Sequence, residues 1–156
     1  MKFTHLIEIN DPLLPLVDML TREQLWRGLV LRAKAPKLFV PYLDGCSITQ
    51  PSDYGFSREL QYGDLLIRDA VTLTTGHAVH YAIPQQKDIA PSSLTMTIEE
   101  PQSDLFFVRF SYEDSQPEEE GSVDAFYNEF RRSAYQEADI DTVRLIRQMA
   151  QDGQLD

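Results

Sequence analysis

A chain of 156 residues, 42% of them hydrophobic and 10% aromatic, has the length and apolar content of one globular domain over residues 1–156 rather than of a disordered polymer. Its formal net charge of −11 disfavours nucleic acid and anionic membranes as partners, and no apolar run approaches the roughly 18–20 residues that cross a bilayer. The single cysteine and the lack of a signal-peptide pattern favour a cytoplasmic protein without intrachain disulfides.

The first predicted element is a strand over residues 2–9, where apolar and polar side chains alternate. One of its faces carries Phe3, His5, Ile7 and Ile9. His5 could exchange a proton near neutral pH, as a general base, if it borders a pocket. A histidine on an apolar face is more often a hydrogen-bonded core residue, so the sequence supports both interpretations.

A helix is predicted over residues 21–33, in the stretch TREQLWRGLVLRA. Thr21 and Gln24 have the spacing of a capping box, in which each side chain satisfies a backbone donor at the start of the helix. A further short helical turn fits between the prolines that follow. The apolar stripe holds Leu25, Trp26, Leu29, Val30 and Ala33, whereas Arg22, Glu23, Arg27 and Arg32 lie mostly off it. The helix therefore packs on a solid core or closes one end of a cavity, and Trp26 lines that cavity only if its end is open.

The middle of the chain is rich in β-branched and aromatic residues in short runs separated by turn signals. These runs predict six strands, near residues 46–50, 56–62, 65–73, 77–83, 93–100 and 105–113. A long helix is predicted over residues 123–151, with Gly153 just beyond its end. Its apolar side is expected to hold Tyr127, Phe130, Ala134, Ala138, Leu145 and Met149. Consecutive strands with separate helices predict an α+β fold with an antiparallel sheet.

Two turns suggest how the middle strands pair. A two-residue Gly63-Asp64 turn of type II′ places Arg58 opposite Asp69 and gathers apolar residues on the same face. A three-residue loop over residues 74–76 would place Asp69 opposite Tyr81, whereas a two-residue turn there would scatter the apolar set.

The two hairpins together predict a row of Arg58, Asp69 and Tyr81 on the inner face of the sheet. Charged groups on an apolar face need partners, because burial of an isolated charge is very costly. One interpretation is a structural ion pair beside a tyrosine hydroxyl. The other is a row that orients a polar group of a bound ligand, and the sequence favours neither.

Several runs resemble the START/Bet v 1-like superfamily of helix-grip proteins (SRPBCC), and within it the AtaL-like branch. They are FTHLIEIND, LTREQLWRGLVLRA, SLTMTIEEP, FVRFSYE and SAYQEADIDTVRLIR, and they span nearly the whole chain. The resemblance implies a curved seven-stranded antiparallel sheet around a long C-terminal helix, with two short helices after the first strand. It also implies a hydrophobic cavity for lipids, sterols, polyketides or other aromatic compounds. Some members cyclise or dehydrate polyketides, and many only bind or carry.

Under that fold, the expected ligand-binding residues are Phe3, Ile7, Trp26, Met96, Phe106, Phe110, Tyr112, Phe130, Ala134, Tyr135 and Ala138, and the catalytic candidates are His5, Arg58, Asp69 and Tyr81. No cofactor is expected, and no metal, because His77 and His80 face opposite sides of a strand.

The partner expected is a hydrophobic small molecule, and a homodimer is possible through the charged face of the long helix. Three functions remain open: a binding protein with cyclase- or dehydratase-like proton chemistry, a non-catalytic carrier or sensor, and an interaction module whose cavity its own side chains fill.

Overall fold

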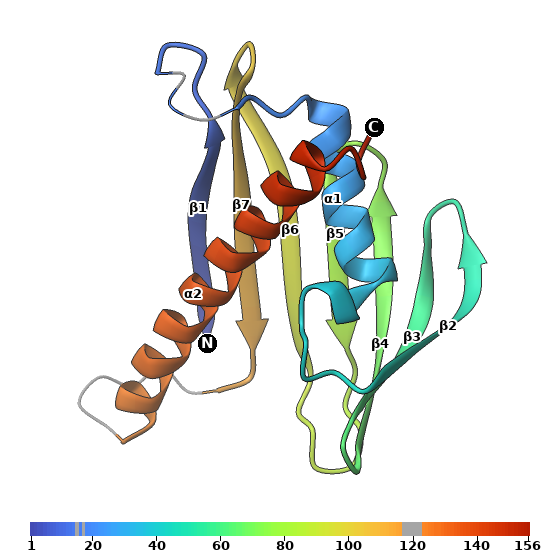
Figure 1. The fold of residues 1–156 in the computed structure, drawn as a ribbon. Helices are drawn as coiled ribbons and strands as arrows, with labels where there is room; N and C mark the ends of the chain where they lie inside the picture. Colours follow the sequence, from blue (N-terminus) through green and yellow to red (C-terminus); the bar gives the residue numbers. More distant parts are fainter. Residues whose placement is uncertain (15, 17, 117–122) are drawn as a thin grey trace.

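The computed structural model describes residues 1–156 except 15, 17 and 117–122. It contains a seven-stranded antiparallel sheet in the order β1-β7-β6-β5-β4-β3-β2. The strands are β1 (Lys2–Asn10), β2 (Gly45–Ser52), β3 (Gly55–Tyr62), β4 (Leu65–Thr74), β5 (Ala78–Ile83), β6 (Ser92–Gln102) and β7 (Leu105–Asp114). Helices α1 (Arg22–Lys34) and α2 (Val123–Gln151) and the short 3-10 helix η1 (Pro36–Leu38) lie on one face of this sheet (Figure 1). The predicted α+β helix-grip fold is confirmed, with element ends within a few residues of those expected.

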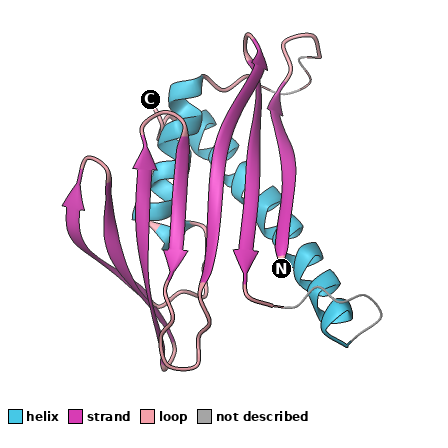
Figure 2. Ribbon diagram, turned by 180° about the vertical axis from the view of Figure 1, so that it is seen from behind, coloured by secondary structure: helices cyan, strands magenta, loops and turns pink. Residues whose placement is uncertain are grey.

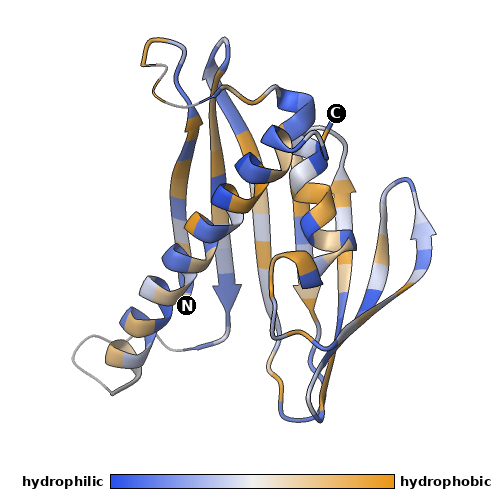
Figure 3. Ribbon diagram, in the orientation of Figure 1, coloured by the Kyte–Doolittle hydropathy of each residue, from blue (hydrophilic) through white to orange (hydrophobic). Residues whose placement is uncertain are grey.

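The core lies between the sheet and the helices, because the other face of the sheet carries no helix (Figure 2). Apolar and polar residues alternate along the strands, so one set of side chains points toward the helices (Figure 3). Val79, Met96 and Phe110 are fully buried on the central strands. Leu25 of α1 and Ile146 of α2 pack onto the same cluster, so both helices are held by the sheet core. None of the helices formed by the described residues has the length and apolar character needed to span a bilayer.

The predicted capping box starts α1. Thr21 Oγ1 accepts from the backbone N–H of Gln24 at 3.1 Å, and Gln24 Oε1 accepts from the backbone N–H of Thr21 at 3.0 Å. Two donors that the helix leaves unpaired are thereby satisfied. The predicted stripe is confirmed at Leu25, Leu29 and Ala33, which have no exposed surface.

The hairpin of β3 and β4 has the predicted register, with Arg58 opposite Asp69. Gly63 has φ 57° and Asp64 does not have a positive φ, as a type II′ turn requires. The predicted partners in the next hairpin are wrong by two residues, since Tyr81 lies opposite Val71 rather than Asp69. The loop begins one residue later than expected: Thr74 pairs with Ala78, and the turn closes from His77 N–H to the Thr74 carbonyl at 2.9 Å. A shift of two residues keeps every side chain on its face, so Tyr81 still points inward.

The predicted inner face of α2 is wrong in its N-terminal half. Phe130 is 67% exposed, and Ala134 and Ala138 are also exposed. The side chains that turn toward the sheet in this half are Asn128 and Asp139, together with Tyr135, which was predicted to line the cavity. Further along, Thr142, Val143, Ile146 and the predicted Met149 also turn inward. This stripe is polar at its start, and a search for the most apolar side of the helix therefore selects the wrong face. The predicted helix end is confirmed: Gly153 has φ 75°, and Gln154 N–H donates to the Met149 carbonyl.

Helices α1 and α2 approach each other closely at Gly28. A Cβ atom added there would lie 2.6 Å from Cγ2 of the buried Ile146. Since Cγ2 is bonded directly to the branched Cβ atom of Ile146, it has little freedom to move away. Gly28 is therefore required by the space between the helices, although glycine weakens a helix.

We expect Gly28→Ala to lower the free energy of unfolding by about 1–2 kcal/mol, because overpacking outweighs the gain of about 1 kcal/mol in helix propensity. Urea unfolding measures this change. Gly45→Ala is the matched control, because a Cβ atom at Gly45 meets nothing within 4 Å. A Gly28→Ala variant more stable than the wild type would contradict the close packing.

Candidate functional site

Arg58 and Asp69 form a buried, bidentate ion pair on the inner face of the sheet. Arg58 Nε donates to Asp69 Oδ1 at 2.9 Å, and Nη2 donates to Oδ2 at 2.5 Å. The third nitrogen, Nη1, donates to the backbone carbonyl of Ala33 at 2.9 Å. That carbonyl lies in the last turn of α1, where helix carbonyls lack partners within the helix. The pair thus joins β3 and β4 and fixes the C-terminal end of α1 above them.

A cavity of about 330 Å³ lies beside this pair, between the sheet and the two helices. Three of the four candidate residues, Arg58, Asp69 and Tyr81, line it together. Side chains of both helices close it, with Arg32 from α1 and Tyr135 from α2. Its other lining residues are Leu60, Tyr62, Ile83, Ser92, Ser93, Leu94, Tyr112, Glu113 and Asp114. The walls are mainly apolar and aromatic, with charged groups gathered at defined points, as in many small-molecule sites.

Two guanidinium groups lie over the Tyr81 ring. The Cζ atoms of Arg58 and Arg32 are 4.9 Å and 5.2 Å from its centroid. The apolar stripe of the sequence predicted that Arg32 lies on the side of α1 that faces away from the sheet. Arg32 follows Leu25 by seven residues and Gly28 by four, and both are buried, so this spacing could have placed it on the inner face.

The Tyr81 hydroxyl and Arg32 Nε are both buried, and neither has a hydrogen-bond partner among the described residues. Burial disfavours the charge on Arg32, but the electrostatic effects of Tyr81, Tyr112 and Asp139 outweigh it and raise the pKa of its guanidinium. Arg32 is therefore a charged group with unused donors at the cavity wall.

A second polar group lies between β1, β7 and α2. Tyr112 donates its hydroxyl hydrogen to Asp139, at 2.7 and 2.9 Å from the two carboxylate oxygens. His5 Nε2 lies 2.7 Å from Asp139 Oδ2. Burial raises the pKa of Asp139 despite these hydrogen bonds. Burial, followed by the influence of Asp139, raises the pKa of Tyr112 far above its ordinary value.

His5 does not itself line the cavity, but it connects to the cavity wall through Asp139 and Tyr112. Its ring stacks between those of Phe3 and Phe110, at centroid distances of 5.3 and 5.4 Å. The sequence did not indicate that Asp139 points inward, because the predicted inner face of this helix was chosen by its apolar residues.

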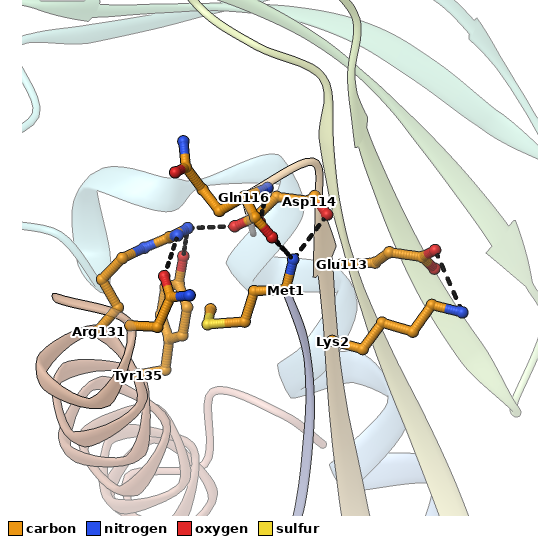
Figure 4. Close-up of polar contacts among 8 residues, drawn as sticks. Met1, Lys2, Glu113, Asp114, Gln116, Arg131 and Tyr135 are labelled. Atoms are coloured by element: carbon orange, nitrogen blue, oxygen red, sulfur yellow. Dashed lines mark hydrogen bonds and ion pairs between the residues drawn. The ribbon is translucent and has the colours of Figure 1, made fainter. Parts of the chain in front are cut away.

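The rim of the cavity near the start of α2 holds a network of charges (Figure 4). Arg131 donates to Asp114 and, at 3.0 Å, to the Tyr135 hydroxyl. The amino group of Met1 donates to Asp114 Oδ1 at 3.0 Å. Burial alone would raise the pKa of Asp114, but hydrogen bonds from Gln116, Met1 and Arg131 lower it below its ordinary value. Asp114 is thus ionised and neutralised by its own partners. Tyr135 in turn stacks on Tyr112 at 3.9 Å between ring centroids.

The expected lining residues fall into three groups. Tyr112 and Tyr135 line the cavity. The following pack into or against the hydrophobic core and are not among the cavity-lining residues: Ile7, Trp26, Met96, Phe106 and Phe110. Phe3 does not line the cavity either, and its ring stacks on those of His5 and Tyr112. Phe130, Ala134 and Ala138 lie on the exposed face of α2 and cannot reach the cavity.

Among the described residues, no group of three His, Cys, Asp or Glu side chains is placed to hold a metal ion. His80 Nδ1 lies 2.7 Å from Thr95 Oγ1, within the sheet.

Comparison with solved structures shows that the protein has the helix-grip fold. StfQ, a di-domain ARO/CYC from the steffimycin biosynthetic pathway, superposes with a TM-score of 0.69 over 97% of this chain and 51% of its own, at 11% identity. Human STARD10 gives 0.64 over 98% and 66%, at 11% identity. The Zhui aromatase/cyclase from Streptomyces sp. R1128 gives 0.61 over 97% and 93%, at 10% identity. The chain thus spans about half the length of the di-domain protein.

Within this fold class the chain belongs to the AtaL family, described as acetylaranotin biosynthesis cluster protein L, whose model matches residues 7–153. No curated protein matches the sequence.

We expect Arg58→Met to lower the free energy of unfolding by about 3–5 kcal/mol, because it leaves Asp69 charged, buried and unpaired. The double variant Arg58→Met/Asp69→Leu should recover most of this loss. Chemical denaturation measures both. Arg68→Met is the control: its 3.3 Å pair with Glu59 is exposed and contributes at most about 1 kcal/mol. Equal effects of Arg58→Met and Arg68→Met would exclude the anchoring role.

The raised pKa of Asp139 predicts a particular dependence of stability on pH. Its protonated form is favoured more in the folded than in the unfolded chain, so the stabilisation is full below the unfolded pKa and is lost as pH rises through the folded pKa. Asp139→Asn removes this titration. The free energy of unfolding of the wild type minus that of the variant should therefore be largest in acid and should decrease as pH rises.

Urea titrations at a series of pH values measure that difference. Asp141→Asn, which changes an exposed carboxylate on the same helix, should give a smaller dependence. An Asp139→Asn difference that increases with pH would show that the carboxylate is stabilised, not destabilised, by its site.

Proposed function

We propose that this protein binds a compact hydrophobic or aromatic small molecule in the cavity between its sheet and its two helices, and carries it without turnover. The observation that carries this proposal is the cavity itself, about 330 Å³ in volume and walled by Leu60, Ile83 and Leu94 together with tyrosine rings. Its volume is at the lower end of the roughly 300–1,000 Å³ typical of small-molecule sites, which favours a molecule of one or two rings over a long chain.

The class of the protein supports the same proposal. One structural relative is named as an ARO/CYC from the steffimycin biosynthetic pathway and another as an aromatase/cyclase, and the family description refers to an acetylaranotin biosynthesis cluster. A larger hollow of about 440 Å³ lies elsewhere, lined by residues 16 and 18–20 and the end of α2. Its polar lining residues include Asp18, Gln24 and Arg147, and none of its lining residues comes from the sheet.

Catalysis of a cyclase or dehydratase type is the second candidate, and the contacts of Tyr112, Asp139 and His5 favour it. Such chemistry needs a proton donor or acceptor that touches the bound molecule. Of these three residues, only Tyr112 lines the cavity; its hydroxyl hydrogen is donated to Asp139, and its raised pKa makes it a poor acid. The geometry therefore supports binding more strongly than proton transfer.

Filling the cavity tests the binding proposal. Leu94 lies on β6 between Tyr81 and Tyr112 and lines the cavity, so Leu94→Trp should occupy its volume. With 2-naphthamide as a neutral aromatic probe, isothermal titration should show binding by the wild type that weakens about tenfold or more in Leu94→Trp. Leu66→Trp is the control, since Leu66 lies on the outer face of the same sheet.

Native mass spectrometry of protein purified from its source should show a copurified compound of aromatic character. Binding of 2-naphthamide that Leu94→Trp leaves unchanged would contradict the assignment of this cavity as the binding site. Failure of the wild type to bind this probe, together with the absence of any copurified compound, would contradict the proposed function.

A further inference from the structure

Among the described residues, no carboxylate forms an ion pair with Arg32. Its Nε is fully buried and has no hydrogen-bond partner there, and its guanidinium lies over the Tyr81 ring. The simplest explanation for a positive charge at this position is that Arg32, in the last turn of α1, interacts with the negative end of the helix dipole. That interaction is weak, whereas leaving a donor of a charged group buried without an acceptor is costly. The dipole does not account for Arg32.

The carboxylates around the cavity already form ion pairs or hydrogen bonds with other groups. Asp69 is bound by Arg58, and Asp114 is bound by Arg131 and the amino group of Met1. Glu113 pairs with Lys2 at 3.7 Å on the surface. Asp139 acts on Arg32 through space but accepts hydrogen bonds from Tyr112 and His5 instead. Of the two arginines that line the cavity, Arg32 is the one without a carboxylate partner among the described residues.

The Tyr81 hydroxyl is the second unsatisfied group at the same place. It is buried, it lines the cavity, and the guanidinium of Arg32 lies 5.2 Å from the centre of its ring. An anionic oxygen at this point would accept hydrogen bonds from two groups that otherwise have none. A neutral apolar molecule would leave both of them without partners.

We propose that the molecule bound in this cavity is an organic acid, whose carboxylate pairs with Arg32 and accepts a hydrogen bond from the Tyr81 hydroxyl. This inference rests on the proposed function and adds the chemical class of the ligand. The apolar body of the acid lies against Leu60, Ile83 and Leu94. Arg58 cannot take the carboxylate in place of Arg32, because its three nitrogens already donate to Asp69 and Ala33.

The test compares 2-naphthoate with 2-naphthamide, which has nearly the same shape and no charge. At neutral pH the wild type should bind 2-naphthoate about tenfold or more tightly than 2-naphthamide, because hydrogen bonds to charged groups are the stronger ones. In Arg32→Met, which keeps an unbranched apolar side chain, this preference should disappear while binding of 2-naphthamide is retained. Isothermal titration measures all four affinities.

Arg144→Met is the matched control, since it removes one positive charge from an exposed position on α2. It should keep the preference for the acid, which separates a local contact from the effect of net charge. The melting temperature of ligand-free Arg32→Met should be higher than that of the wild type, because the substitution removes a buried charge without a partner.

The outcomes separate this inference from the proposed function. Equal binding of 2-naphthoate and 2-naphthamide by the wild type would overturn the inference and leave the proposed function standing. A preference for the acid that survives in Arg32→Met would also overturn it. Absence of binding by both probes would count against the cavity as a binding site and therefore against both.

Discussion

The guanidinium of Arg58 joins three parts of the chain: β3, β4 and the C-terminal end of α1. Its bonds to Asp69 hold β3 and β4 in register, and its bond to the Ala33 carbonyl fixes the end of α1 over the sheet. Removing these charges from water is costly, and this cost is offset only because every nitrogen of the group has an acceptor. Arg32 immediately precedes Ala33. The same contact that anchors the helix therefore positions Arg32 at the cavity wall.

The features that the sequence predicted well are those determined by local chemistry. The capping box at Thr21, the type II′ turn at Gly63 and the pair of Arg58 and Asp69 depend on residues close in sequence, and all three are confirmed. The loop before Tyr81 was harder, because several loop lengths keep the same faces together. Its partners changed by two residues, yet Tyr81 still reached the cavity.

The inward-facing charges were not predicted, for a physical reason. A stripe drawn by hydrophobicity excludes a charged residue by definition, so Arg32 was placed off the stripe of α1 and Asp139 was not identified. Both face the interior because the groups opposite them are polar: Tyr112 and His5 bind Asp139, and Tyr81 lies under Arg32. Such partners come from distant strands, and no local pattern in the helix encodes them. Phe130 shows the converse, an aromatic side chain left exposed because the polar side of α2 meets the sheet.

The two arginines at the cavity differ in a way that separates scaffold from site. Arg58 has all its partners within the chain, so its role is to hold β3, β4 and the end of α1 together. Arg32 has no ion-pair partner among the described residues, although its place in the chain is fixed by the neighbouring Ala33. A solid core would have no use for a buried charge of this kind, since an apolar side chain would pack there at lower cost. The position of Arg32 is therefore explained by what enters the cavity, and the fold alone does not require it.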